Sequence, residues 1–442
     1  MRNKKRIAII GSGISGLGCA YNLAKLGHFE ITIFEKESRI GGHSHTINFS
    51  PHSSSKTFGI DTGFLVFNEW TYPRLISFFK ELQVPTTKSD MSFSVSVPQE
   101  DGHNLEWAGT NLNSVFSQRK NIFSLRFLRM LFDVIRFNIL SKNLVKNTNV
   151  SSVSAHVTVK EFLKTHHFNE NFQNWYLLPM IGAIWSCPIS EMLEFPFLTL
   201  ATFCENHGLL NIINRPQWHT VTSGSREYVN RIVNFLKTKD TQIFHESVTS
   251  VIRQNSEHEN ISLQTNSGQT HTFDELIFAC HSNEALEILK DPSTSEISLL
   301  TSIPYQKNTA YVHEDASLLP HNKNTWAAWN YSASLNHSQV CVHYLINKLQ
   351  PLPVNLNETP VIVSLNPHQI PSPLLTHQII EYSHPLFNSL SVTQQQLLPK
   401  MQGQQHTWFC GAWTGYGFHE DGLRSGEIVA ELLNNLGNYA SA

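Results

Sequence analysis

The first 35 residues hold the pattern that most restricts how this chain can fold. An apolar run at residues 7–10 leads directly into three glycines spaced G-x-G-x-x-G, and a second apolar run, at residues 31–34, ends at Glu35. Between the two runs, residues 14–26 have the composition of a helix. Strand, glycine turn, helix, strand and terminal acid together are typical of a βαβ unit that binds an adenine dinucleotide.

Each residue type in this unit has a physical role. Gly11 permits a tight turn, Gly13 allows the backbone to approach a pyrophosphate, and Gly16 lets the helix pack against the sheet. The pyrophosphate then lies at the positive end of the helix dipole, and Glu35 accepts hydrogen bonds from ribose hydroxyls. The nucleotide-binding residues predicted for this unit are Gly11, Ser12, Gly13, Ser15, Gly16, Glu35 and Lys36.

The composition excludes several classes of protein. A net charge of −3 argues against nucleic acid as a partner. The basic start of the chain is followed by only four apolar residues, which suit a first strand better than a secretory signal, and no run of about 18 apolar residues predicts a membrane span. We therefore expect a cytoplasmic protein. The six cysteines form no C-x-x-C pair, which argues against a zinc site or a disulfide framework; they are Cys19, Cys187, Cys204, Cys280, Cys341 and Cys410.

The 442 residues exceed what one hydrophobic core usually serves, so two domains are expected. The α/β pattern of the start returns in the strand-like residues 248–253 and again near the end of the chain. The intervening segments are helix-rich and aromatic, or rich in prolines and short β-prone runs. We predict an α/β nucleotide-binding domain interleaved with an α+β substrate domain. The first comprises residues 1–88, 216–298 and 400–442, and the second comprises residues 89–215 and 299–399.

Three further motifs accompany the first. Gly41-Gly42 follows Glu35, an Asp-Thr-Gly turn ends at Gly63, and the last segment carries Gly411 and Asp421-Gly422-Leu423. Together they resemble the flavoprotein superfamily of amine oxidases and phytoene desaturases, over nearly the whole chain. The resemblance implies FAD as the cofactor and a Rossmann-like domain of the glutathione reductase and amine oxidase type. The further cofactor-binding residues that it implies are Gly41, Gly42, His43, Gly63, Phe64, Val248, Gly411, Trp413, Asp421, Gly422 and Leu423.

A narrower resemblance is also present. Its strings are residues 42–46, 61–68, 328–331, 347–350, 365–367, 384–385 and 410–423. They are similar to predicted FAD-binding proteins associated with cyclopropane fatty acid synthases, and to a domain at the N-terminus of plant cyclopropane synthases. This resemblance implies an acyl-lipid substrate and a cyclopropane-synthase-like methyltransferase as a functional partner. It also fits His43, which stands where many amine oxidases carry a phosphate-binding arginine.

Other residues are candidates for chemistry. Tyr416, His419 and Glu420 precede or join the turn expected at the flavin, where an imidazole or carboxylate can act as a base; the alternative is that they shape the turn. Asn330 and Tyr331 follow an aromatic run and either line a substrate cavity or belong to an aromatic core. His43 and His45 lack further ligands at a metal-binding spacing, so no metal is predicted.

Residues 119–146 form a basic, aromatic segment. They include seven basic residues and one acid, Asp133, a local charge of +6 in a chain whose total is −3. One hypothesis is that this segment docks onto an anionic membrane surface. The alternative is a buried helix whose long basic side chains reach water.

Four functions fit these observations. The first is FAD-dependent oxidation of an unsaturated or modified fatty acyl chain, free or in phospholipid. The others are flavin-dependent double-bond isomerisation, amine oxidation, and a flavin-bound accessory role beside a lipid methyltransferase. Oxidation and isomerisation differ in whether an electron acceptor is required.

Overall fold

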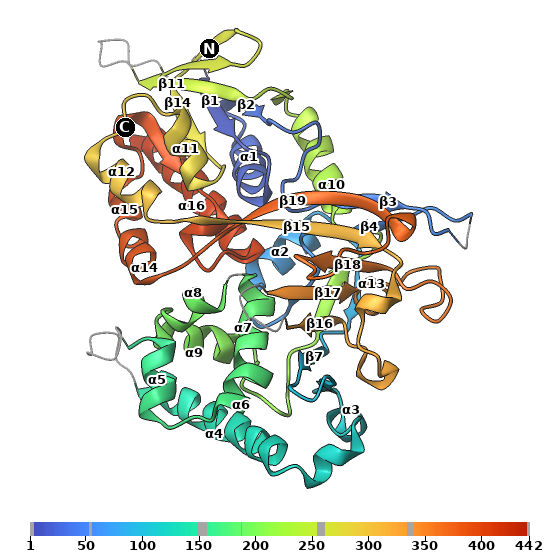
Figure 1. Ribbon diagram of the computed structural model, residues 1–442. Coiled ribbons are helices and arrows are strands. Elements are labelled where there is room, and N and C mark those ends of the chain that lie inside the picture. The colour runs from blue at the N-terminus through green and yellow to red at the C-terminus, as the bar shows by residue number, and fades with distance from the viewer. Residues whose placement is uncertain are drawn as a thin grey trace.

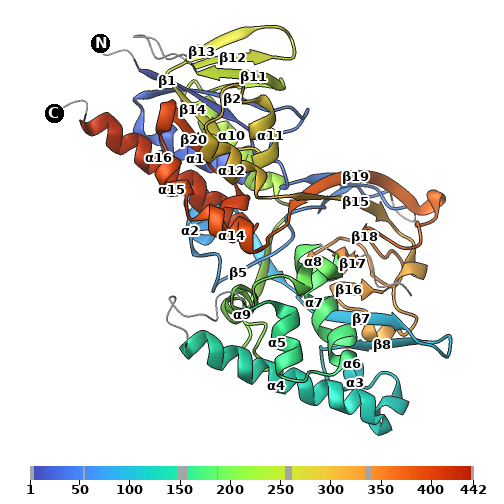
Figure 2. The ribbon, with the colours of Figure 1, turned by 60° about the vertical axis from the view of Figure 1, so that its left-hand side comes forward.

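The computed structural model describes most of the chain. The described residues are 4–52, 55–147, 157–186, 188–253, 261–333 and 340–439. Cys187 lies outside these ranges; the remaining five cysteines are free thiols. Figures 1 and 2 show one sheet near the two termini, and a larger sheet with a helical layer at the opposite side of the molecule.

The five-stranded sheet is parallel and has the strand order β10-β2-β1-β14-β20. Its strands come from the first, third and last segments of the chain: β1 (Lys5–Ile10), β2 (Phe29–Phe34), β10 (Gln242–Phe244), β14 (Glu275–Phe278) and β20 (Thr407–Phe409). The predicted first helix is confirmed as α1 (Ile14–Leu26), which ends at Gly27 with φ 78°. Both faces of this sheet are buried: Ile7 and Ile9 lie in a core shared with α1, whereas Ala8 and Ile10 lie in a core that includes apolar side chains of a second, antiparallel sheet.

The predicted strand at residues 248–253 is confirmed as β11 (Val248–Arg253). It forms a three-stranded antiparallel sheet with β12 (Ile261–Thr265) and β13 (Thr270–Phe273), next to the five-stranded sheet. Two smaller sheets are β3 (Thr46–Phe49) with β4 (Phe58–Asp61), and β9 (Trp218–Val221) between β5 (Phe67–Asn68) and β6 (Thr86–Ser89).

The largest sheet has seven strands in the order β19-β15-β18-β17-β16-β7-β8. Its strands are β7 (Phe93–Pro98), β8 (Asn104–Ala108), β15 (Tyr305–His313), β16 (Trp329–Ser332), β17 (Cys341–Leu345), β18 (Ile362–Leu365) and β19 (Thr376–Pro385). All pairs are antiparallel except β7 with β16. This sheet and the helices near it share one large hydrophobic core.

The remaining helices divide between the two halves. Beside the five-stranded sheet lie α2 (Pro73–Glu81), α10 (Arg226–Lys237), α11 (Ser282–Ile288), α12 (Thr294–Thr301), α14 (Ser389–Gln395), α15 (Leu398–Met401) and α16 (His419–Tyr439). With the larger sheet lie α3 (Leu112–Val115), α4 (Leu125–Asn147), α5 (Val159–Thr165), α6 (Glu170–Phe172), α7 (Leu178–Trp185), α8 (Ile189–Leu193), α9 (Phe197–Asn206) and α13 (Ile346–Leu349). No helix in the described ranges has the length and apolar character needed to cross a bilayer.

A buried chain of hydrogen bonds crosses three strands of the larger sheet. His313 Nδ1 accepts from the Asp315 N–H at 3.0 Å, so its proton is on Nε2, which faces Ser364 Oγ at 2.6 Å. The Ser364 hydroxyl then donates to His343 Nδ1 at 2.6 Å. Each imidazole uses its lone pair as an acceptor and is therefore neutral. Burial lowers the pKa of His313 to about 4 and that of His343 to about 3.

We expect these histidines to make the protein acid-sensitive. Their pKa values in the folded state lie below the ordinary 6.5, so between pH 6.5 and about 4 the unfolded chain binds more protons. Their contribution to stability is full above pH 6.5 and is lost as pH falls, by about 1.4 kcal/mol per pH unit for each histidine.

Urea unfolding at about pH 7, 6 and 5 measures this effect. His343→Gln is expected to reduce the slope of stability against pH, whereas His103→Gln, at an exposed position, leaves it unchanged. Equal slopes for the wild type and His343→Gln would contradict the assignment.

Candidate functional site

The glycine turn after β1 is tightly packed on one side and open on the other. Gly11 has φ 107°, and a Cβ there would lie 2.7 Å from the Ala279 carbonyl oxygen. A Cβ on Gly16 would lie 2.1 Å from the Gly11 carbonyl oxygen. By contrast, a Cβ on Gly13 would meet no heavy atom within 4 Å among the described residues, apart from the adjacent chain. Open space therefore lies beside Gly13, at the start of α1, where no side chain caps the helix.

Glu35 connects the end of β2 to this turn. Its Oε2 accepts hydrogen bonds from the Ser12 N–H at 3.0 Å and from the Ser12 hydroxyl, and its Oε1 accepts from the Glu37 N–H at 2.9 Å. Ser12 Oγ in turn accepts from the Gly41 N–H at 3.2 Å. A carboxylate has about four acceptor positions, so Glu35 retains capacity for ribose hydroxyls.

The second glycine loop packs directly against the first. A Cβ on Gly42 would lie 3.1 Å from Gly13 Cα, and a Cβ on Gly63 would lie 2.3 Å from the His43 carbonyl oxygen. His43 Nε2 is buried and has no hydrogen-bond partner in the described chain. Burial and the neighbouring His384 lower the pKa of His43 well below its ordinary value.

The structure also brings together residues that the sequence analysis did not select. The ring centroid of His43 lies 5.1 Å from Tyr382, 5.3 Å from His384 and 6.2 Å from His281. Tyr382 Oη also contacts Thr62 Oγ1 at 2.7 Å. These residues come from three distant segments. In the sequence, Thr62 and His384 belong to the motifs at residues 61–68 and 384–385, whereas Tyr382 and His281 belong to none.

The C-terminal turn is organised by Asp421. Its Oδ2 accepts from the backbone N–H groups of Tyr416 at 3.0 Å and Phe418 at 3.2 Å, and a Cβ on Gly415 would lie 2.3 Å from its Oδ1. The Gly411 N–H donates to Ser425 Oγ at 2.9 Å. The turn between β20 and α16 is therefore held from both ends, as in an N-terminal cap.

Several residues predicted at the cofactor contribute their side chains to packing. Trp413 is 2% exposed and donates from Nε1 to the Cys280 carbonyl oxygen at 3.2 Å. Leu423 is fully buried, and a Cβ on Gly18 would lie 2.6 Å from its Cδ1. Val248 is buried beside the five-stranded sheet. Lys36 forms an exposed ion pair of 2.6 Å with Glu284.

The contacts of His419 and Glu420 match the alternative interpretation, in which these residues shape the turn. His419 stacks on Phe64 at 3.8 Å and hydrogen-bonds Ser44 Oγ at 2.9 Å, and burial lowers its pKa to about 3. The two carboxylate oxygens of Glu420 accept from the backbone N–H groups of Arg74 and Leu75, each at 2.9 Å. Glu420 therefore caps α2, and both side chains act in packing and capping, because the first turn of α16 faces its neighbours.

Tyr416 has a different environment. It lines a cavity of about 120 Å³ together with Phe195, Thr199, Phe387, Val392, Gln395 and Gly415. A neighbouring smaller hollow of about 20 Å³ shares two of these residues and is lined by Ile181, Trp185, Glu191, Met192, Phe195, Pro385, Leu386 and Phe387. Both cavities are largely apolar, and the carboxylate of Glu191 belongs to an exposed residue.

The predicted cavity residues Asn330 and Tyr331 are in the core instead. Asn330 is 1% exposed, and its amide hydrogen-bonds Ala327, Ser94 and the His343 carbonyl oxygen. Tyr331 is also 1% exposed. Both lie on the central strand β16, whose two faces are covered, so neither lines the two cavities described above.

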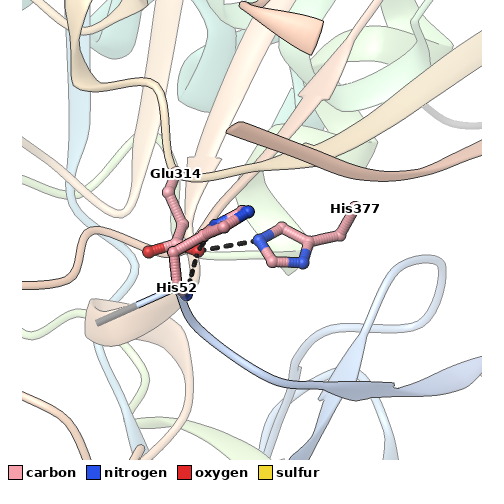
Figure 3. A group of neighbouring side chains, drawn as sticks. All are labelled: His52, Glu314 and His377. Carbon is pink, nitrogen blue, oxygen red and sulfur yellow. Dashed lines mark hydrogen bonds and ion pairs between the residues drawn. The ribbon is translucent and has the colours of Figure 1, made fainter. Parts of the chain in front are cut away.

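A separate polar cluster lies at the far end of β15 and β19 (Figure 3). His52 Nδ1 and His377 Nε2 each contact Glu314 Oε1 at 2.7 Å, and the His52 N–H donates to the same oxygen at 3.0 Å. Two imidazoles and a carboxylate are metal-ligand types. In this structure they hydrogen-bond one another, and the contact holds His52, which follows β3, against the end of the larger sheet.

The residues at the glycine turns fit the expected FAD. The open side of Gly13 at an uncapped helix start suits a pyrophosphate, Glu35 suits the ribose, and the unpartnered His43 Nε2 suits a polar group of the cofactor.

Comparisons with known proteins agree with this fit. Among solved structures, the fatty acid isomerase from P. acnes has a TM-score of 0.65 at 14% identity, covering 98% of this chain and 99% of that one. Cyclohexylamine oxidase from Brevibacterium oxydans has a TM-score of 0.66 at 15% identity, covering 98% and 100%. At these identities the likeness shows the fold.

Curated relatives match over shorter stretches. A polyenoic fatty acid isomerase of Ptilota filicina is 29% identical over 115 residues, which are 26% of this chain and 23% of the relative. An L-amino acid oxidase of Cerastes cerastes is 50% identical over 44 residues, which are 10% of this chain and 8% of the relative. The matched regions thus span less than a quarter of either relative.

The family model of the flavin containing amine oxidoreductases matches residues 14–313, well over half of the chain. The match includes α1, the second glycine loop and β14. The chain therefore belongs to the flavin-containing amine oxidoreductase family and is an FAD-dependent oxidoreductase.

Proposed function

We propose that this oxidoreductase acts on unsaturated or modified fatty acyl chains, free or in phospholipid. The observation that carries the proposal is the pair of adjoining apolar cavities beside the turn at residues 411–418. An acyl chain needs aromatic and aliphatic walls with few polar groups, and the lining of both cavities is of this kind. The likeness to two fatty acid isomerases supports the same substrate class.

The roles of the chain's own residues follow from the lining. Phe195 and Phe387, which line both cavities, would hold the acyl chain in one orientation and exclude water from it. When bound, FAD supplies an acceptor for a hydride equivalent from a carbon next to a double bond. Burial raises the pKa of Tyr416, so its phenol stays protonated at neutral pH and acts as a hydrogen-bond donor to substrate.

A second candidate is isomerisation of a double bond without net oxidation. Its support is that both acyl-lipid proteins among the relatives described above are isomerases. Dehydrogenation consumes an electron acceptor in each turnover, whereas isomerisation returns the hydride equivalent to the substrate and needs none.

Anaerobic titration of the FAD-loaded protein with an unsaturated phospholipid or fatty acid tests the proposal. We expect loss of the oxidised-flavin absorbance with the lipid and none with a polyamine. Product formed without an acceptor and without lasting bleaching would identify the isomerase. Bleaching by the polyamine alone would contradict the acyl-chain proposal in favour of amine oxidation. A stable complex with a cyclopropane-synthase-type methyltransferase and no turnover would favour the accessory role.

A variant that fills the cavity connects the activity to this site. Thr199→Trp is expected to lower kcat/KM for the lipid about 100-fold while the flavin spectrum is retained, because the indole occupies the space of the acyl chain. Leu374→Trp, at a side chain that is 83% exposed, is the matched control and should leave kcat/KM unchanged.

A further inference from the structure

The helix α4 carries an apolar stripe on its solvent-facing side. The stripe residues are Leu125, Leu128, Phe132, Ile135 and Ile139, which are between 39% and 82% exposed. Their spacing of three and four residues places them on one face of the helix. The opposite face is buried and packs on α6 and α9. The stripe is therefore separate from the face that stabilises the fold. The sequence alone left open whether this segment is a buried helix or a docking surface.

The exposed apolar surface extends beyond the helix at both ends. Phe123, just before α4, is 87% exposed. Ile212 and Ile213 are 63% and 77% exposed, and their loop lies beside α4 because Lys142 Nζ donates to Asn211 Oδ1. Figures 1 and 2 show α4 along the edge of the molecule farthest from the five-stranded sheet. We call Phe123, the stripe residues, Ile212 and Ile213 the apolar edge.

The exposed charges of residues 119–146 are all positive. Asp133, the only acid of residues 119–146, is fully buried and lies 3.4 Å from Arg136 and 3.7 Å from Arg129. Lys120 and Arg126 are exposed and have no ion-pair partner in the described part of the chain. The edge thus presents apolar side chains between the unpaired cations of Lys120 and Arg126. The carboxylate of Asp133, which would offset their positive charge, faces inward.

We propose that the apolar edge docks the protein onto an anionic lipid bilayer. A half-exposed apolar stripe flanked by Lys and Arg matches an interface whose headgroups are negative and whose interior is apolar. The stripe spacing also fits a coiled coil, but two copies would bring basic flanks together, and α4 offers no exposed acid to pair with them. The loop isoleucines broaden the edge beyond the single face that a partner helix covers.

The edge is also near the cavity of the proposed substrate. α9 packs on the inner face of α4, and its Thr199 lines the larger cavity. A docked molecule would hold that cavity one helix layer away from the bilayer. Docking itself does not depend on the proposed reaction, because it is measured without turnover.

Co-sedimentation of the FAD-loaded protein with vesicles tests the proposal. We expect binding to phosphatidylglycerol-containing vesicles that weakens with added salt, and weak binding to pure phosphatidylcholine. Lys120→Glu with Arg126→Glu is expected to reduce the partition coefficient about 30-fold or more, since each basic residue near an anionic surface contributes several-fold. Phe132→Ser with Ile135→Ser is expected to reduce it about 10-fold.

Matched variants away from α4 serve as controls. Lys290→Glu with Lys400→Glu changes charge equally, and Ile370→Ser with Leu374→Ser removes two apolar side chains that are more exposed than Phe132 and Ile135; both should bind as the wild type does. Unchanged thermal unfolding of all four variants shows that they are folded. The proposal is overturned if the wild type ignores anionic vesicles, or if edge and control variants bind alike. It is also overturned if the Phe132 and Ile135 changes dissociate a dimer without affecting vesicle binding.

Discussion

Replacing Gly13 by valine is expected to abolish FAD binding while the fold stays intact. The φ of Gly13 is −65°, which any residue adopts, and its Cβ position is in open space. The Cβ of a valine there meets no heavy atom within 4 Å among the described residues outside the adjacent chain, and the side chain takes up space that a pyrophosphate must enter. We expect FAD affinity to fall at least about 100-fold, which is about 2.7 kcal/mol of binding free energy.

Fluorescence titration of the apoprotein with FAD measures this loss, and circular dichroism reports the fold. Gly109→Val is the matched control, because Gly109 also has open space at its Cβ and no positive φ, yet lies at the end of β8. The prediction fails if Gly13→Val retains wild-type affinity, or if Gly109→Val loses affinity to the same extent.

Gly426→Ala is expected to destabilise the protein strongly, although alanine is the better helix former. A Cβ on Gly426 would lie 2.2 Å from the Ser15 carbonyl oxygen and 3.1 Å from the Cys19 N, so α16 and α1 touch through backbone. In a helix interior the change would by itself gain about 1 kcal/mol. We expect a net loss of about 3 kcal/mol, because neither helix can move without opening the core beneath.

The displacement also reaches the cofactor site. A Cβ on Gly422, one turn earlier, would lie 2.9 Å from Ser15 Oγ, so a shift of α16 changes the turn that Asp421 holds. We expect weaker FAD binding together with a lower unfolding midpoint in urea. Glu431→Ala, at an exposed position of the same helix, should be neutral or slightly stabilising. Equal stability of the two variants would show that the helices tolerate separation.

The first prediction concerns space that the cofactor would fill, and the second concerns space that the fold has already filled. Gly13 directly precedes α1, and Gly426 contacts the first turns of α1. Only the three-dimensional structure shows that the Cβ position is open at Gly13 and blocked at Gly426. The distinction matters for the proposed acyl-lipid function as well. A loss of activity in Gly13→Val would report the cofactor alone, whereas a loss in Thr199→Trp with the flavin retained would report the cavity.

The sequence by itself determined the local architecture of the nucleotide-binding unit. The helix at residues 14–26 and the strand at residues 248–253 have the predicted bounds, because apolar periodicity and glycine position decide such elements within a few residues. The three-glycine turn and Glu35 also lie together as expected, since only about 20 residues separate them. FAD dependence and the oxidoreductase family followed from these short motifs.

Only the tertiary structure decided which way the candidate side chains face. His419 and Glu420 adjoin the expected flavin turn in sequence, but they pack on Phe64 and cap α2. The side-chain amide of Asn330 is hydrogen-bonded within a central strand. His43 contacts His384, although 341 positions of the chain separate them. The outward stripe of α4 was likewise undecided in the sequence. Orientation depends on long-range packing partners, and a one-dimensional pattern records the period of a helix or strand but not what covers each face.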